Sequence, residues 1–175
     1  MICKNVLEAI GGTPLIRLNH MTDADAAEIL VKFEAVNIGG SVKTRTAYNM
    51  ILAAERTGLL NQDSVIVEPT SGNQGIGLAL VCAVRGYKAV IIMPDSVSEE
   101  RRKIVQHYGA EVILIHDDGD IGECIRACAK RAAQMAAEDP HVFVPGQFEN
   151  PANPEAHLVH TAVEILEQAG KPIHG

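Results

Sequence analysis

The stretch Val65-Ile-Val-Glu-Pro-Thr-Ser-Gly-Asn-Gln-Gly-Ile-Gly-Leu-Ala-Leu-Val81 decides the fold of this chain. A short β-branched run leads into a turn of polar residues and glycine, and small and aliphatic residues with helical spacing then continue to Arg85. A strand, a tight turn and a closely packed helix form the first half of a β-α-β unit. We therefore predict a parallel sheet covered by helices.

Strand and helix patterns keep alternating after this unit. The segments that we expect are a strand over Lys88–Met93, a helix from Ser96 to Tyr108, a strand over Glu111–Ile115, a helix over Ile121–Ala137 and an extended His141–Val144. Ser96 and Glu99 have the spacing of a capping box at the start of the first of these helices. The alternation predicts an α/β fold with three layers, in which a parallel sheet is flanked by helices.

The two ends of the chain depart from this alternation. Pro14–Leu18 and Ile29–Phe33 are predicted strands joined only by a polar connection, so they need a partner outside the central unit. A helix is predicted from about Asn153 to Gln168, and it ends at Gly170 because glycine readily adopts the left-handed conformation that closes a helix.

Composition and charge narrow the class of function. A chain of 175 residues with 47% hydrophobic residues is long enough to bury a core. The net charge of −7 and the pI near 5.4 argue against nucleic acid or an anionic membrane as the main partner, so we expect a small-molecule ligand. The longest apolar run, Ile76–Val84, is short of the roughly 20 residues that cross a bilayer. The absence of an export-signal pattern and four cysteines expected as reduced thiols predict a cytoplasmic location.

Lys43 is the first candidate for chemistry. Asn37-Ile-Gly-Gly-Ser-Val-Lys43 is a glycine-rich turn with Ser41 as a potential N-cap, and a helix is predicted from about Val42 to Arg56. A cation in the first turn opposes the positive end of the helix dipole, which favours the neutral amine and hence a nucleophile. A solvated surface lysine is the alternative interpretation of this feature taken alone.

Thr70-Ser-Gly-Asn-Gln-Gly75 is a second glycine-rich turn between a strand and a helix. Its backbone N–H groups and hydroxyls are suited to a carboxylate or phosphate, and ligands of open α/β sheets collect at the carboxyl ends of strands. The spacing is neither the dinucleotide fingerprint nor the P-loop. The alternative is a tight turn with a capped helix and no ligand.

Two further groups of residues are candidates for a binding or metal site. Gly146-Gln-Phe-Glu-Asn-Pro-Ala-Asn153 is a polar loop after an extended segment, and such loops often reach into a site, although an ordinary connection has the same composition. Cys124 with Cys128, and His157 with His160, have helical spacing, but no carboxylate or CxxC pair completes a ligand set. We predict no metal site.

Taken together, three motifs resemble the cysteine synthase (O-acetylserine sulfhydrylase) family: Asn37-Ile-Gly-Gly-Ser-Val-Lys-Thr-Arg45, Glu68-Pro-Thr-Ser-Gly-Asn-Gln-Gly-Ile-Gly77 and Gly146-Gln-Phe-Glu-Asn-Pro-Ala-Asn-Pro154. Ile10-Gly-Gly-Thr-Pro-Leu15 and Glu100-Arg-Arg-Lys-Ile104 extend the resemblance over essentially the whole chain. The resemblance implies the tryptophan-synthase-β-like fold, fold type II, of pyridoxal phosphate enzymes.

The resemblance also implies roles for single residues. Lys43 matches the lysine that holds pyridoxal 5'-phosphate as a Schiff base and then removes the substrate α-proton, which requires a low pKa of its amine. Asn73 matches the residue beside the phenolic oxygen of the cofactor. Thr70, Ser71, Gly72 and the adjacent Asn73 and Gln74 match the loop that grips the substrate α-carboxylate, and Gln147 matches a further contact to it.

The implied reaction is β-replacement, which makes L-cysteine from O-acetyl-L-serine, or another activated serine, and sulfide. The implied partners are a second copy of the full-length protein in a homodimer and the C-terminal tail of serine acetyltransferase. The family usually has Thr, Asp and Pro where this chain has Gln74, Thr44 and Ile38. Gln74 keeps open a β-eliminating cysteine or serine lyase and a cystathionine β-synthase-like relative. A non-catalytic fragment that binds an amino acid or a protein tail is the alternative from another class.

Length sets the last expectation. Family members are longer, and this chain ends before the Gly/Thr-rich loop that binds the cofactor phosphate in the family. By the resemblance, residues 1–36 and 148–175 belong to a larger domain, most of which is absent, and residues 37–147 form the smaller α/β domain. We expect an N-terminal half that does not hold the cofactor tightly and is not a competent enzyme by itself.

Overall fold

A parallel sheet organises the chain in a computed structural model. The structure describes residues 2–20, 23 and 25–173. Positions 1, 21, 22, 24, 174 and 175, which belong to the predicted N-terminal and C-terminal segments, lie outside the described residues. The strands lie in the order β5-β4-β3-β6 and are all parallel. Their bounds are β3 (Val65–Pro69), β4 (Lys88–Pro94), β5 (Glu111–Ile115) and β6 (Val142–Phe143). The predicted parallel sheet is confirmed.

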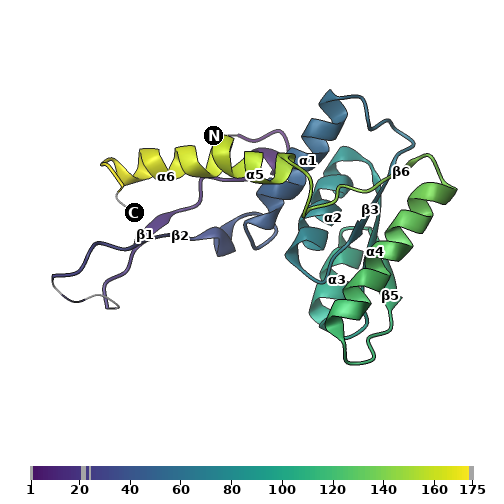
Figure 1. Cartoon of the computed structure of the whole chain (residues 1–175). Helices are drawn as coiled ribbons and strands as arrows, with labels where there is room; N and C mark the ends of the chain where they lie inside the picture. Colours follow the sequence, from purple (N-terminus) through teal and green to yellow (C-terminus); the bar gives the residue numbers. More distant parts are fainter. Residues whose placement is uncertain (1, 21–22, 24, 174–175) are drawn as a thin grey trace.

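Helices cover both faces of this sheet (Figure 1). One face carries α4 (Ile121–Glu138), whose Cys124, Cys128 and Ala132 pack on Val67, Val90 and Ile92. The other face carries α2 (Asn73–Arg85) and α3 (Glu99–His107), and α1 (Lys43–Arg56) packs on α2. Alternate residues of β3 and β4 are buried on opposite faces, as expected for strands covered on both sides. The α/β class and the three layers are confirmed.

A second group of elements lies apart from the sheet, on the other side of α1 (Figure 1). β1 (Leu15–Arg17) and β2 (Leu30–Lys32) form an antiparallel pair, and the short turn η2 (Glu34–Val36) follows β2. The short turn η1 (Val6–Ala9) instead contacts α2, and its Leu7 belongs to the core on that face of the sheet. The single helix predicted from Asn153 is observed as α5 (Ala152–Ala156), one wider π turn, η3 (His157–Thr161), and α6 (Ala162–Ala169). The two predicted N-terminal strands therefore pair with each other.

The structure corrects two details. The predicted capping box at Ser96 is wrong: α3 begins at Glu99 after Ser98, and the Ser96 hydroxyl donates to Asp117 Oδ2 at 2.6 Å. α1 begins at Lys43 and has no side-chain cap at Val42, although Ser41 Oγ accepts the Lys43 N–H at 3.2 Å.

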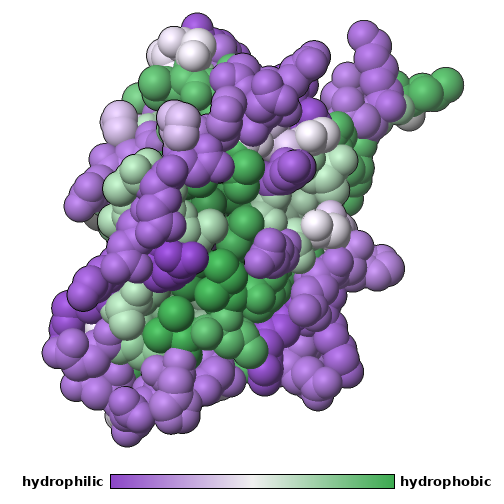
Figure 2. All heavy atoms as spheres, turned by 90° about the vertical axis from the view of Figure 1, so that its right-hand side faces the viewer, coloured by the Kyte–Doolittle hydropathy of each residue, from purple (hydrophilic) through white to green (hydrophobic). Residues whose placement is uncertain are grey.

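The surface on the α4 and β5 side of the molecule combines a hollowed apolar band with a hydrophilic frame (Figure 2). Leu114, Ile121 and Ile125 are the large apolar residues that these two elements expose. Within the described residues, no helix has both the length and the apolar character needed to span a bilayer.

Candidate active site

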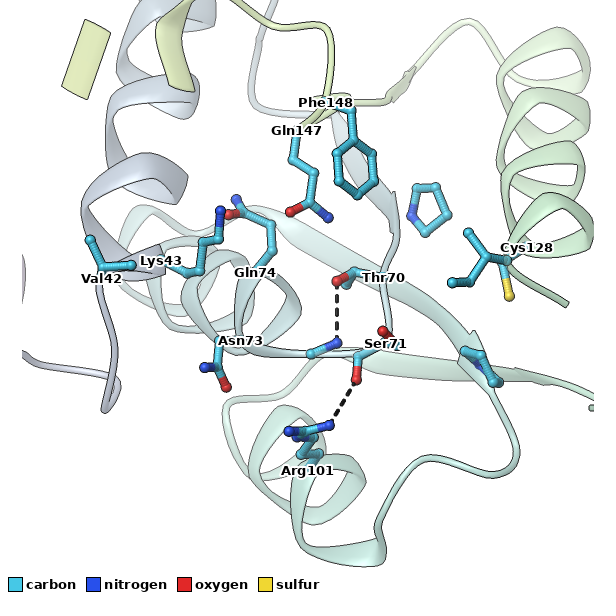
Figure 3. Close-up of a pocket in the computed structure, with 14 residues that line it drawn as sticks. Val42, Lys43, Thr70, Ser71, Asn73, Gln74, Arg101, Cys128, Gln147 and Phe148 are labelled. Atoms are coloured by element: carbon cyan, nitrogen blue, oxygen red, sulfur yellow. Dashed lines mark hydrogen bonds between the residues drawn. The ribbon is translucent and has the colours of Figure 1, made fainter. Parts of the chain in front are cut away.

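A cavity of about 420 Å³ lies at the carboxyl ends of β3 and β4. All the residues that the sequence analysis selected for the site line it: Lys43, Thr70, Ser71, Gly72, Asn73, Gln74 and Gln147. They come from the start of α1, the turn between β3 and α2, and the loop after β6 (Figure 3). Three segments far apart in the sequence thus form one pocket.

Lys43 is placed in the pocket by the glycine turn before α1. Gly39 and Gly40 have φ values of +84° and +77°, in the left-handed region that glycine adopts without a steric penalty. A Cβ at Gly39 would lie 2.5 Å from Thr44 Oγ1, so only glycine fits there. Figure 3 shows the Lys43 side chain extending toward the end of the pocket that Gln74 and Gln147 also face.

Two glycines of α2 let that helix approach its neighbours closely. A Cβ at Gly77 would lie 2.9 Å from the carbonyl oxygen of Lys43, and a Cβ at Gly75 would lie 2.9 Å from both Ile91 Cγ2 and Thr70 Cγ2. Real Cβ atoms do not come this near, so glycine is needed at both positions. The glycine spacing in the second motif therefore serves to pack the lysine turn and the Thr70 turn against one helix.

The Thr70–Gln74 turn presents free donors to the pocket. Among the described residues, no side chain caps the start of α2, so N–H groups of its first turn remain available. The helix dipole adds a partial positive charge at the same place, and both features favour an anion there. Within the turn, the Gly72 N–H donates to Thr70 Oγ1 at 3.3 Å. This geometry fits the predicted role in binding a carboxylate.

Gln74 is held from α1 and still has one unused polar atom. The residue is 2% exposed, and its Oε1 accepts from Thr46 Oγ1 at 2.9 Å. Its Nε2 is buried and has no hydrogen-bond partner among the described residues. An unpartnered buried donor costs about 1–3 kcal/mol. A ligand acceptor in the pocket would remove that cost.

Gln147 is fixed by hydrogen bonds to its backbone. Its N–H donates to Glu68 Oε1 at 3.2 Å and its carbonyl accepts from Asn153 Nδ2 at 2.6 Å. Only the side chain remains free, and Figure 3 shows it directed into the pocket. Burial raises the pKa of the Glu68 carboxyl, and the two backbone N–H groups that it accepts partly offset that rise.

Several residues that were not predicted from the sequence also line the pocket: Val42, Pro69, Pro94, Arg101, Ile125, Cys128 and Phe148. Arg101 Nη1 donates to the Ser71 carbonyl at 3.3 Å, and both Arg101 and Phe148 stand inside motifs that had been noted. Ile125 and Cys128 come from α4, which carries no motif. Burial raises the pKa of the Cys128 thiol to about 11, so this thiol is protonated at neutral pH.

Comparisons with known proteins agree with the geometry. The family model described as pyridoxal-phosphate dependent enzyme matches residues 6–175. A probable cysteine synthase of Bacillus subtilis is 47% identical over 98% of this chain and 55% of the relative. A cysteine synthase of Staphylococcus aureus is 48% identical over 97% of this chain and 53% of the relative.

Solved structures are similar as well. A hydrogen sulfide-producing enzyme from Fusobacterium nucleatum has a TM-score of 0.87 and 44% identity over 97% of this chain and 54% of its own. An O-acetylserine dependent cystathionine β-synthase from Helicobacter pylori has a TM-score of 0.87 and 35% identity over 97% of this chain and 55% of its own. These similarities confirm the expected type II fold.

The chain spans about half the length of the curated relatives that it matches. The resemblance to cysteine synthases that the three motifs indicated is confirmed by the identity over nearly all of the chain. This chain belongs to the family of pyridoxal-phosphate dependent enzymes.

Proposed function

We propose that this chain supplies the lysine and the carboxylate-binding residues of an enzyme that makes L-cysteine from O-acetyl-L-serine, or another activated serine, and sulfide. The observation that carries the proposal is that Lys43, the Thr70–Gln74 turn and Gln147 line one pocket. A reaction of an amino acid on pyridoxal phosphate requires an amine for the cofactor and a site for the α-carboxylate, and this pocket offers candidates for both. Relatives named cysteine synthase support the choice of reaction.

The residues present fit pyridoxal phosphate at its reactive end. Lys43 offers a primary amine for its aldehyde, Asn73 would lie beside its phenolic oxygen, and the unpartnered Gln74 Nε2 shows that the pocket has a donor without an acceptor. When bound, the cofactor supplies an electron sink for negative charge at the substrate α-carbon.

Each residue then has a separate task in the proposed reaction. Thr70, Ser71 and Gln147 hold the α-carboxylate and so orient the α-hydrogen toward the amine of Lys43. Lys43 removes the proton from the α-carbon, and acetate leaves from the β-carbon. Sulfide forms the new carbon–sulfur bond at the β-carbon, and Lys43 returns its proton to the α-carbon.

Two related reactions are the rivals within the enzyme class. The Fusobacterium relative is described as hydrogen sulfide-producing, and the Helicobacter relative is described as an O-acetylserine dependent cystathionine β-synthase. Gln74 places a long amide beside the carboxylate site and keeps both reactions open. The test supplies a segment that corresponds to the remaining half of the relatives and measures sulfide. Consumption of sulfide indicates replacement, and release of sulfide indicates elimination.

The rival from another class is a fragment that only binds an amino acid or a protein tail. Adding pyridoxal phosphate to the 175-residue chain, reducing with borohydride and mapping the labelled peptide separates the classes. We expect label at Lys43, its loss in Lys43→Ala, and its retention in Lys103→Ala, because Lys103 is an exposed lysine on α3. Label scattered over surface lysines, or none, would leave the binding fragment.

The assembly and location are proposals of the same kind. We expect the complete protein to be a cytoplasmic homodimer that also binds the C-terminal tail of serine acetyltransferase. Sedimentation velocity of the complete protein, with and without a peptide of that tail, tests the homodimer and the tail binding. A monomer unaffected by the peptide would contradict them.

A further inference from the structure

Glu68 is a buried carboxylate that the proposed reaction does not use. It lies near the carboxyl end of β3 and is 1% exposed. Removing a carboxylate from water is costly unless hydrogen bonds compensate for the lost hydration. A glutamate at this position therefore depends on its partners.

Those partners are two successive backbone N–H groups from the loop after β6. Gly146 N donates to Glu68 Oε2 at 2.9 Å, and Gln147 N donates to Glu68 Oε1 at 3.2 Å. Gly146 has a φ of +66°, in the left-handed region, so the chain turns sharply there. One side chain of β3 thus binds the peptide that precedes the Gln147 side chain.

The far side of Gln147 is held as well. Its carbonyl accepts from Asn153 Nδ2 at 2.6 Å, and Asn150 Nδ2 donates to the Pro145 carbonyl at 2.8 Å. With the backbone of Gln147 bound on both sides, the point from which its side chain leaves the loop is fixed. That side chain is 9% exposed and faces the pocket (Figure 3).

The same strand end carries the other half of the carboxylate site. Glu68 is followed by Pro69 and Thr70, and the Thr70 N–H donates to the Ile92 carbonyl on β4 at 2.9 Å. Glu68 binds the Gln147 backbone, and the Thr70–Gln74 turn begins two positions after Glu68. The end of β3 thus holds both parts of the site together, although about 75 residues separate the turn from Gln147 along the chain.

We infer that Glu68 is a positioning residue, which sets the Gln147 amide in register with the Thr70–Gln74 turn for the α-carboxylate of the amino-acid substrate. The inference rests on the proposed function, because it assigns Gln147 to that carboxylate. A carboxylate suits the task because it accepts two N–H groups at once. A glutamine in its place would turn an amide N–H toward a backbone N–H and lose one of the two contacts.

A double-mutant cycle in the complete enzyme loaded with pyridoxal phosphate tests the inference. We expect Glu68→Gln to raise the KM for the amino-acid substrate about tenfold with little change in kcat, and Gln147→Ala to do the same. Because Glu68 acts through Gln147, the double variant should also raise KM only about tenfold rather than about a hundredfold.

A matched control is Glu164→Gln, which alters another carboxylate with short hydrogen bonds, on α6 and outside the pocket. It should leave the KM of the wild-type enzyme unchanged, and combining it with Gln147→Ala should give the same KM as Gln147→Ala alone. Hydrogen exchange of the Gly146 and Gln147 amides gives a readout apart from activity. We expect exchange of at least one of these two amides to be at least about tenfold faster in Glu68→Gln, and an unchanged rate at Ile91, since only the loop loses an acceptor.

The outcomes separate the inference from the proposed function. Additive KM effects of Glu68→Gln and Gln147→Ala, in an enzyme that is labelled at Lys43 and turns over, would overturn the inference and leave the function standing. An unlabelled, inactive wild-type protein would overturn both. Where Glu68→Gln does not fold, Asn153→Ala replaces it, since it releases the other side of Gln147; a KM unchanged by Asn153→Ala would also overturn the inference.

Discussion

The sheet region and the flanking region of this chain are stabilised in different ways. The sheet region, residues 43–150, buries side chains on both faces of β3 and β4. The flanking region, the described residues of 2–36 and 152–173, contributes three buried apolar residues, Leu7, Ala152 and Ala156. Its large apolar side chains are mainly exposed: Ile2, Val6, Ile16, Ile29, Val31, Phe33, Val36, Leu158, Val159, Val163, Leu166 and Ile173.

Ion pairs connect the elements of the flanking region to each other and to α1. Arg45 of α1, with a side chain 2% exposed, pairs with Glu34 at 2.9 Å and with Glu164 at 2.6 Å. Lys32 of β2 pairs with Glu164 at 2.6 Å. These pairs join α1, η2, β2 and α6. The sheet region therefore depends on buried apolar area, whereas the flanking region depends on a network of ion pairs around the buried Arg45 side chain.

Truncating the core of the sheet region should have the largest effect. Ile91 is 0% exposed in β4, and we expect Ile91→Ala to lower the free energy of unfolding by about 3–4 kcal/mol through lost burial and a cavity. Val163→Ala on α6, at a residue 44% exposed, should cost less than about 0.5 kcal/mol. Urea unfolding measures both. Equal losses would contradict the comparison.

Breaking the ion network should have the next largest effect, and a local one. Arg45→Met removes the cation that Glu34 and Glu164 share and leaves Lys32 as the partner of Glu164, so we expect a loss of about 2–3 kcal/mol. Arg85→Met removes a more exposed pair with Glu55 and should cost less than about 1 kcal/mol.

Hydrogen exchange shows where the Arg45→Met effect lies. Amides of β1, β2 and α6 should lose protection, while those of β4 keep theirs. Equal loss in both regions would mean that the network supports the whole molecule rather than the flanking region alone.

Acid should act on the same network with a smaller effect. Hydrogen bonds from Arg45, followed by those from Lys32, lower the pKa of Glu164 from 4.5 to about 2. A lowered folded-state pKa means that this stabilisation is present above pH 4.5 and is lost as pH falls toward 2. NMR signals of α6 should therefore broaden or shift before those of β4 in an acid titration. Glu164→Gln should remove most of this difference between the regions.

The exposed apolar side chains of α6 should have the smallest effect on stability. Leu166 is 59% exposed, so Leu166→Lys should change the free energy of unfolding by less than about 0.5 kcal/mol. It should, however, reduce self-association of the 175-residue chain, because it places a charge in an apolar face. Glu167→Gln changes the net charge equally without removing apolar surface and should not reduce association. Sedimentation velocity measures both variants.

Local features of the site could be predicted from the sequence. Glycine spacing, β-branched runs and polar turns act over a few residues, so the sequence predicts Lys43 at a helix start and the Thr70–Gln74 turn after a strand without any tertiary contact. The predicted capping box at Ser96 is wrong because α3 begins only at Glu99, after Ser98, and Ser96 instead makes a tertiary contact by donating its hydroxyl hydrogen to Asp117.

The sequence by itself determined the alternation of strands and helices, the two glycine turns and the family, because each depends on local residue pattern or on similarity along the chain. Only the tertiary structure decided that Arg101 reaches Ser71, that Cys128 of α4 lines the pocket, and that Glu68 holds Gln147. These contacts join residues 30 to 79 positions apart, or face the pocket from a helix without a motif. Their partners are set by how the elements pack, which no local pattern records.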